Sequence, residues 1–405
     1  MRASMRALVV SLLCIAAVAA GAAVAAGVAG GCWGCAAGAV SAAGASPGRL
    51  EVSEQAVRLL AQVARQPRLT LAAAGDCMFD RGVRTACDQR GMDWPLSAVR
   101  GTLRAADVAF LNLETSIARG GARLAGKGIW FRSAPEFAQE LASAGVDVVT
   151  LANNHVLDYD DPAFVETLSN LAAAGIAVCG GGKNMAEARR PAVLASNGVS
   201  VAFLGYSEFA HIYWSVAKPK RFVAGEASPG VSPWSRESIL EDIRRAKGLA
   251  DHVVVSFHWG DEYVSMPADR QVQLAHAAID AGASVVHGHH PHVLQPVEVY
   301  HGGVIFYSMG NFVFDQKKPA TVESMIAQVT FSPEAVVRAE IIPVRIEECR
   351  PRPLAAWAAR AAVDKISLAS ARMGTRIVTI GERGLVMGPI KGSPIEAEGF
   401  RNLLP

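Results

Sequence analysis

The chain has 405 residues, of which 51% are hydrophobic, so it can bury a large core and is not an intrinsically disordered chain. Its formal net charge is only +2 and no dense run of Lys and Arg occurs, which argues against a nucleic-acid partner. Seven cysteines are too few for a disulfide framework in a chain of this size. Cys77 and Cys87 either form a disulfide in an oxidising compartment or remain two unlinked, apolar side chains.

The amino-terminal region is typical of an exported protein. Arg2 and Arg6 precede an apolar stretch without charges, and residues 1–31 therefore predict a signal peptide or a membrane anchor, which is cleaved, lipidated or retained. Residues 32–66 are first rich in Ala, Gly and Ser and then show helical spacing, so we expect a flexible linker and a short helix. The body of the protein is expected to be extracytoplasmic, either membrane-anchored or exported.

From residue 67 to residue 348 the sequence alternates between strand and helix patterns. Strands are expected at 69–74, 108–113, 146–152, 199–205, 253–257, 283–287 and 304–308. Helices are expected at 135–144, 162–174, 235–250 and 269–281. This alternation predicts a layered α/β domain with largely parallel pairing in its first part.

The carboxyl-terminal part has a different pattern. Residues 325–331 and 336–346 predict two strands joined by a turn, which we expect to close one sheet in antiparallel fashion. Residues 349–405 are expected to form a C-terminal extension that contains one helix over residues 355–371. We assign this extension no chemical role.

Side chains able to bind a metal follow five of the expected strands. They are Asp76, Glu114, Asn154, His155, His258, His289, His290 and His292. Since α/β proteins build their sites where strands end, we expect these side chains to share one pocket. Carboxylates combined with imidazoles favour Zn, Mn or Fe over Ca. Asp158 follows His155 by three residues and is placed to orient its imidazole.

Several motifs in this stretch occur in the order and spacing of a known family. They are Gly75-Asp76, Asn112-Leu113-Glu114, Ala152-Asn153-Asn154-His155, His258-Trp259-Gly260, Gly288-His289-His290-Pro291-His292 and Tyr307-Ser308-Met309-Gly310-Asn311-Phe312. From about Thr70 to Gln316 the chain resembles the bacterial CapA family, named for poly-γ-glutamate capsule synthesis, which is similar to the calcineurin-like metallophosphoesterases. The resemblance implies a four-layer α/β/β/α sandwich with metal ligands at strand ends, and an extracytoplasmic domain behind an amino-terminal membrane segment.

The resemblance also implies roles for single residues. The metal ligands would be Asp76, Glu114, Asn154, His258 and one or two of His289, His290 and His292. His155 would be an acid or an electrostatic stabiliser near a leaving group. Apart from the resemblance, Glu262 is a candidate general base or partner of a ligand if a metal is bound. A dinuclear phosphoesterase begins with Asp-x-His, but Met78 stands at that third position, and the bridging aspartate is replaced by Glu114 or by Asn112. The protein is therefore expected to bind one or two divalent ions.

Three functions stay open from the sequence. The first is a metal-dependent hydrolase or transferase of the cell envelope, phosphoesterase-like, that acts on a phosphoester or on an anionic polymer such as poly-γ-glutamate. The second is a non-catalytic subunit that binds or exports the polymer together with other capsule-synthesis subunits. In the third, the histidines are simply packed in the core and bind no metal.

Overall fold

The computed structural model describes residues 66–212 and 221–388. The predicted signal or anchor over residues 1–31 lies outside the described residues, as does almost all of the predicted linker. Within the described part of the chain, none of the helices combines the length and the apolar character that crossing a membrane would require.

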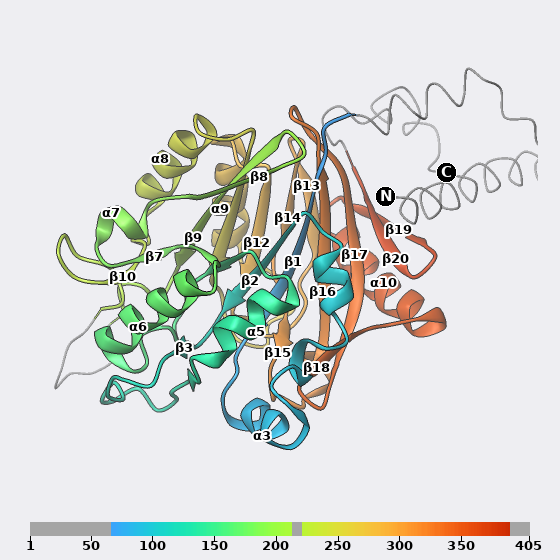
Figure 1. Ribbon diagram of the computed structural model, residues 1–405. Coiled ribbons are helices and arrows are strands. Elements are labelled where there is room, and N and C mark those ends of the chain that lie inside the picture. Colours follow the sequence, from blue (N-terminus) through green and yellow to red (C-terminus); the bar gives the residue numbers. More distant parts are fainter. Residues whose placement is uncertain (1–65, 213–220, 389–405) are drawn as a thin grey trace, which may run out of the picture. The chain divides into compact units, whose positions relative to one another are not determined.

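The larger of the two main sheets has ten strands. Eight follow the order β19-β20-β17-β16-β1-β2-β5-β6, while β15 pairs with β1 and β18 pairs with β17 (Figure 1). Their bounds are β1 (Leu69–Cys77), β2 (Val108–Leu113), β5 (Val148–Thr150), β6 (Ala177–Cys179), β15 (Asn311–Val313), β16 (Glu323–Phe331), β17 (Val336–Glu347), β18 (Arg350–Pro353), β19 (Arg376–Ile380) and β20 (Arg383–Met387). From β1 to β6 the neighbours are parallel, whereas β16 and β17 are antiparallel to their neighbours.

The second sheet has six strands in the order β13-β14-β12-β11-β9-β8. Their bounds are β8 (Ala192–Ser196), β9 (Val199–Ser207), β11 (His252–His258), β12 (Val285–His289), β13 (Val297–Tyr300) and β14 (Gly303–Phe306). The four central strands are parallel and the two edge strands pair antiparallel. Every strand expected between residues 69 and 308 is therefore present, with shifted ends, and the parallel pairing is confirmed.

One expectation about the larger sheet is wrong. The expected pair, β16 and β17, is antiparallel as predicted, but it does not close the sheet, because β20 and β19 lie beyond β17. Both of these strands come from the predicted C-terminal extension, which also contributes β18 and helix α10 (Ala356–Ala371). They were missed because each is only five residues long and partly exposed, which leaves little apolar signal.

Three apolar clusters fill the spaces between sheets and helices. In β1 the side chains of Leu69, Leu71 and Ala73 belong to a cluster shared by both sheets, whereas Ala72 and Ala74 belong to a cluster shared with helices. This alternation follows from the two-residue period of a strand. The helices of the second cluster are α3 (Arg81–Arg90), α4 (Arg100–Arg104), α5 (Glu136–Ala144) and α6 (Asp160–Ala173).

The third cluster joins the other face of the six-stranded sheet to α8 (Arg236–Lys247) and α9 (Asp269–Asp280). The expected helices are thus present as α5, α6, α8, α9 and α10. The remaining short elements are β3 (Ser116–Ile117), β4 (Arg132–Ser133), β7 (Gly181–Gly182), β10 (Gly230–Val231), α7 (Met185–Ala188), η1 (Trp94–Leu96) and η2 (Pro319–Val322). Cys77 and Cys87 are free thiols, which agrees with the unlinked alternative.

Candidate metal centre

Asp76 is placed by an irregularity at the end of β1. The register between β1 and β2 shifts between Ala74 and Asp76, and such a bulge redirects the side chains that follow it. Gly75 is needed here because a Cβ atom at this position would lie 1.9 Å from the carbonyl oxygen of Gly310. The backbone N–H of Asp76 donates to that same oxygen at 3.0 Å. The close approach of β1 to Gly310 therefore fixes the position of the Asp76 carboxylate.

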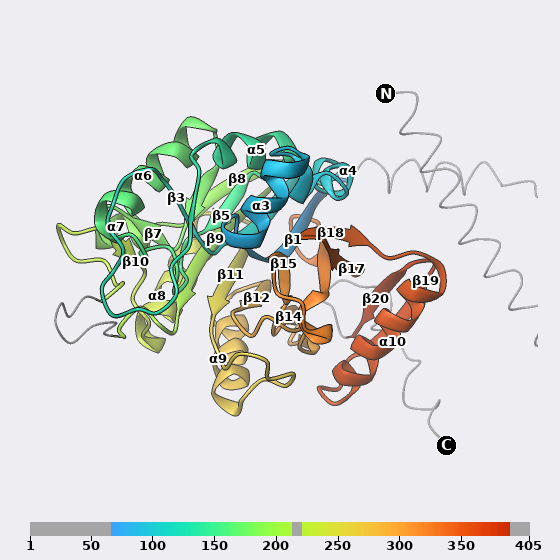
Figure 2. The ribbon, with the colours of Figure 1, turned by 90° about the horizontal axis from the view of Figure 1, so that it is seen from below.

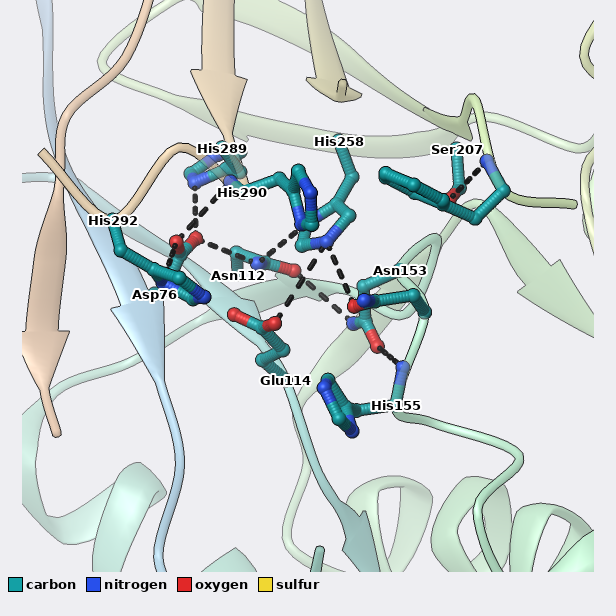
Figure 3. Close-up of polar contacts among 12 residues, drawn as sticks. Asp76, Asn112, Glu114, Asn153, His155, Ser207, His258, His289, His290 and His292 are labelled. Carbon is teal, nitrogen blue, oxygen red and sulfur yellow. Dashed lines mark hydrogen bonds and ion pairs between the residues drawn. The ribbon is translucent and has the colours of Figure 1, made fainter. Parts of the chain in front are cut away.

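The Asp76 carboxylate is fully buried and lies among nitrogen atoms (Figure 3). Its Oδ1 accepts from Asn112 Nδ2 at 2.8 Å and lies 3.1 Å from His289 Nδ1. Its Oδ2 accepts from the backbone N–H of His290 at 3.2 Å and lies 3.3 Å from His292 Nδ1. Burial alone would raise the pKa of Asp76, but the hydrogen bonds from His289 and His292 hold it well below its usual value. Asp76 is therefore an anion near neutral pH.

Glu114 is the least satisfied group of the site. It follows β2, it is fully buried, and neither carboxylate oxygen has a hydrogen-bond partner among the described residues. The nearest ionisable nitrogen is His258 Nε2, 3.8 Å from Oε1. Burial and the charge of Asp76 raise the pKa of Glu114 well above its usual value. A buried carboxylate without partners is costly, and a bound cation is one partner that would satisfy it.

Two groups of ligand atoms meet at Glu114. One consists of Glu114, His258 and His290, and the other of Asp76, Glu114 and His292; within each group the atoms lie within 4.8 Å of one another. The Oδ1 atom of Asn154 is 3.0 Å from His258 Nε2 and adds an oxygen to the first group. This donor set fits one divalent ion, or two that share Glu114.

The protonation of the imidazoles suits metal binding in the first group. Burial and the charge of His290 hold the pKa of His258 well below its usual value, and burial with the charge of His292 lowers the pKa of His290 to about 3. Both rings are therefore neutral, as a ligand must be. His292 differs: burial alone would lower its pKa, but the hydrogen bond with Asp76 and the charge of Glu114 raise it to about 9.

His155 lies beside these groups and is held by two buried charges. Its Nδ1 is 2.7 Å from Asp158 Oδ2 and 3.2 Å from Lys127 Nζ, and Lys127 also forms an ion pair with Asp158. Burial and the charge of Lys127 hold the pKa of His155 well below its usual value. Burial raises the pKa of Asp158 to about 7, although Lys127 opposes this. Asp158 thus occupies the orienting position expected for it.

Residues 70–316 match the family described as "Bacterial capsule synthesis protein PGA_cap", which is more than half of the chain. The chain belongs to the CapA family of capsule synthesis proteins.

Relatives of known name agree with this membership. The PGA biosynthesis protein CapA of Bacillus subtilis (strain 168) is 37% identical over 71% of this chain and 74% of its own length. The capsule biosynthesis protein CapA of Bacillus anthracis is 34% identical over 71% of this chain and 70% of its own length. A solved structure of a hypothetical protein from Thermus thermophilus covers 70% of this chain and 96% of that chain, at 17% identity and a TM-score of 0.38, a likeness too distant to bear on function.

In this CapA-family chain the other predicted site residues lie at different distances from the centre. His289 contacts Asp76 but belongs to neither ligand group, and its Nε2 has no partner among the described residues. Glu262 is exposed, and its charge acts on Glu114 and on His292. The seven predicted metal ligands are thus brought together, with Glu262 farther out.

The hydroxyl groups of two buried tyrosines bond to buried carboxylates of the core. The Tyr206 hydroxyl donates to Asp242 Oδ2 at 3.0 Å, and the Tyr307 hydroxyl donates to Glu298 Oε2 at 2.6 Å. Both are buried core residues. Tyr263 is exposed, and its ring lies 6.3 Å from the ring of His292.

Sequence reasoning missed several contributors. Asn153 accepts from the backbone N–H groups of His155 and Val156, and it donates to Asn112 Oδ1 at 3.2 Å. The role of Asn153 could have been inferred from its position directly before Asn154 and His155. Lys127 is buried but comes from an irregular loop, and no pattern marked it.

Proposed function

We propose that this CapA-family protein is an extracytoplasmic, metal-dependent hydrolase of the phosphoesterase type. It would act in the synthesis of poly-γ-glutamate or of another anionic polymer of the cell envelope. The main support is the Glu114 carboxylate, which is fully buried, has no hydrogen-bond partner among the described residues, and is shared by two groups of potential metal ligands. The names of the two Bacillus relatives support a place in capsule synthesis.

We also propose that the fold is the four-layer α/β/β/α sandwich of the metallophosphoesterases. The supporting observation is the set of three apolar clusters, one between the two sheets and one between each sheet and its helices. Such an arrangement buries both faces of both sheets, as largely parallel strands require.

The ligands of the divalent ion would be Asp76, Glu114, Asn154, His258 and His290, together with His292, which would give up its proton on binding the ion. When bound, the ion would supply Lewis-acid polarisation of the phosphorus or carbonyl centre under attack. Two cations lie nearby, each already paired with a carboxylate: Lys127 with Asp158 and Arg81 with Asp315. Lys127 lies beside His155, and the Arg81 guanidinium lies 4.6 Å from the centre of the Phe131 ring, which stacks on His155 at 4.0 Å. His155 would contact the substrate through Nε2, because its Nδ1 is held by Asp158, and Glu262 would receive a proton at the exposed side.

One observation favours the second candidate, a non-catalytic subunit that binds or exports the polymer. Burial and the charge of Lys127 hold the pKa of His155 well below its usual value, so its ring is neutral near pH 7 and is a poor acid for a leaving group. A site of this kind can bind an ion and an anionic chain without turning it over.

Metal analysis of the purified full-length protein, with hydrolysis assays on phosphoester and γ-glutamyl substrates, separates the candidates. We expect one or two divalent ions per chain, and hydrolysis that is lost on chelation and in His258→Ala. His301→Ala is the matched control, since this histidine is exposed and pairs with Asp280. Bound metal without turnover would support the non-catalytic subunit. A protein that binds no metal would refute the hydrolase and would favour the function in which the histidines are simply packed in the core.

Export is tested separately. Residues 1–66 fused to a reporter enzyme that is active only outside the cytoplasm should give activity. An inactive but expressed fusion would refute the extracytoplasmic location.

A further inference from the structure

One side of α10 exposes large apolar side chains. In Figures 1 and 2, α10 lies beside β19 and β20, with one side turned away from both main sheets. Trp357 is 81% exposed and Leu368 is 76% exposed. They stand eleven residues apart, which is about three turns of an α-helix, so both point from the same side of α10. We call this side the α10 face, and its exposed residues are Trp357, Arg360, Ala361, Asp364, Lys365, Leu368, Ala371 and Arg372.

The packing of α10 on the domain uses its other side. The buried residues of the helix are Ala359, Val363, Ile366 and Ser370. Trp357 and Leu368 border a cavity of about 790 Å³ instead. Glu382 Oε1 accepts from the backbone N–H of Ala356 at 2.9 Å, which holds the turn between β19 and β20 at the end of α10 where Trp357 lies. Ile380, at the end of β19, is 48% exposed and adds a third apolar side chain there. Large apolar side chains left in water are typical of binding surfaces.

The α10 face belongs to the basic part of the chain. Residues 345–388 contain eight Arg and Lys and four Asp and Glu, a net charge of +4, whereas the net charge of the whole chain is +2. Neither Arg360 nor Arg372 has an ion pair or a side-chain hydrogen bond among the described residues. Lys365 is paired with Glu323 at 2.5 Å, and Asp364 is the one acid of α10. The face therefore combines exposed apolar side chains with an excess of positive charge.

This combination suits the surface of a bilayer that contains anionic lipids. Tryptophan prefers the boundary between headgroups and acyl chains, because its ring is apolar and its N–H is polar. Arginine beside it is attracted by the negative charge of the lipids. An apolar signal and a basic signal together attach a protein where either alone binds only weakly. Trp357 and Leu368 are separated by about 16 Å along the helix, and a bilayer offers the same chemistry over the whole of that length.

We propose that the α10 face lies on an anionic membrane surface. Trp357 and Leu368 insert among the lipids, while Arg360 and Arg372 lie at their phosphate groups. This contact is distinct from any membrane contact of residues 1–31. It goes beyond the proposed function, because it requires neither a metal ion nor hydrolysis.

The test uses the full-length protein and vesicles of phosphatidylglycerol and phosphatidylcholine with brominated acyl chains, because bromine quenches the fluorescence of a tryptophan that it contacts. The wild type should lose emission that Trp357→Phe does not lose. Trp94→Phe is the matched control and should be quenched like the wild type. Trp94 is half-buried, donates to the carbonyl oxygen of Glu348 at 3.0 Å, and its ring contacts Arg90 and Arg350.

The charge of the face is tested in the same assay. Arg360→Gln combined with Arg372→Gln should lower the Trp357-dependent quenching by about threefold or more. Arg104→Gln combined with Arg244→Gln removes the same charge from exposed arginines of α4 and α8, and it should leave the quenching unchanged. All these variants keep residues 1–31, so a contact of that segment with lipid cancels in the comparison.

Three results would overturn the proposal. The first is equal quenching of the wild type and Trp357→Phe, and the second is equal Trp357-dependent quenching by vesicles of phosphatidylcholine alone. The third is a dimer in solution that Trp357→Ala dissociates, because the face would then belong to a second copy of the chain. The quenching should persist after chelation and in His258→Ala, so the failure of the proposed function would leave this result unchanged.

Discussion

Replacing Glu114 by Gln should stabilise the metal-free protein. At pH 8 the wild-type chain either ionises a buried carboxylate that has no hydrogen-bond partner among the described residues or keeps it protonated, and both states cost free energy. Glutamine leaves a buried amide without partners but removes the charge, so only the cost specific to the carboxylate is lost, and the free energy of unfolding should rise by about 1–3 kcal/mol. Since the pKa of Glu114 is raised in the folded state, its protonated form stabilises the fold at low pH, and this contribution is lost as pH rises. The difference between variant and wild type should therefore shrink towards pH 4.

Urea unfolding of chelator-treated protein at pH 4 and pH 8 measures this difference. The control is Glu298→Gln, because Glu298 is also buried but lies 3.0 Å from His276 Nε2 and accepts from the Tyr307 hydroxyl. That variant should lose about 1–3 kcal/mol at pH 8. With saturating metal the wild type should become more stable than Glu114→Gln. The reason is that an ion at 1,000 times its Kd adds about 4 kcal/mol to the free energy of unfolding of the wild type. If metal-free Glu114→Gln is less stable than the wild type at pH 8, the reasoning fails.

Two further stability predictions concern the surroundings of the site. Gly75→Ala should lower the free energy of unfolding, measured in urea, by about 3 kcal/mol or more, because the new Cβ would overlap a backbone oxygen. The control is Gly101→Ala. It should not destabilise the protein, because no atom lies within 4 Å of the new Cβ. Equal stability of these two variants would contradict the packing around β1. Lys127→Met should cost about 3–5 kcal/mol because it leaves Asp158 buried without its cation, and adding Asp158→Asn should recover part of this loss in a double-mutant cycle. Strict additivity of the two changes would show that the pair is not coupled.

Much of the fold was predictable because its central strands are unusually apolar. β2 and β11 are buried along their whole length, so continuous apolar runs mark them in the sequence. β19 and β20 have only short, mixed patterns, and their place beside β17 depends on long-range packing that no local window contains.

The candidate site was predictable to the extent that its residues follow strands. Asp76, Glu114 and His258 were found in this way, since parallel strands end at a common edge. Which histidines join the ligand groups was not predictable. After β12 the backbone adopts positive φ angles at His290 (92°) and at His292 (58°), and these turns decide where each ring points. A residue such as Lys127, held in place by contacts across an irregular loop, leaves no periodic pattern to detect.

The ligand atoms are divided between the two sheets. Asp76 lies in β1 and Glu114 directly follows β2, both in the ten-stranded sheet, whereas His258 ends β11 and His290 directly follows β12, both in the six-stranded sheet. An ion bound by ligands from both sheets would link the two sheets. The protein would therefore bind this ion tightly only after the two sheets have packed together. Metal affinity during refolding would then report tertiary assembly, whereas circular dichroism follows the strands and helices. A collapsed chain with both halves formed but not yet joined should take up the ion no better than a short peptide.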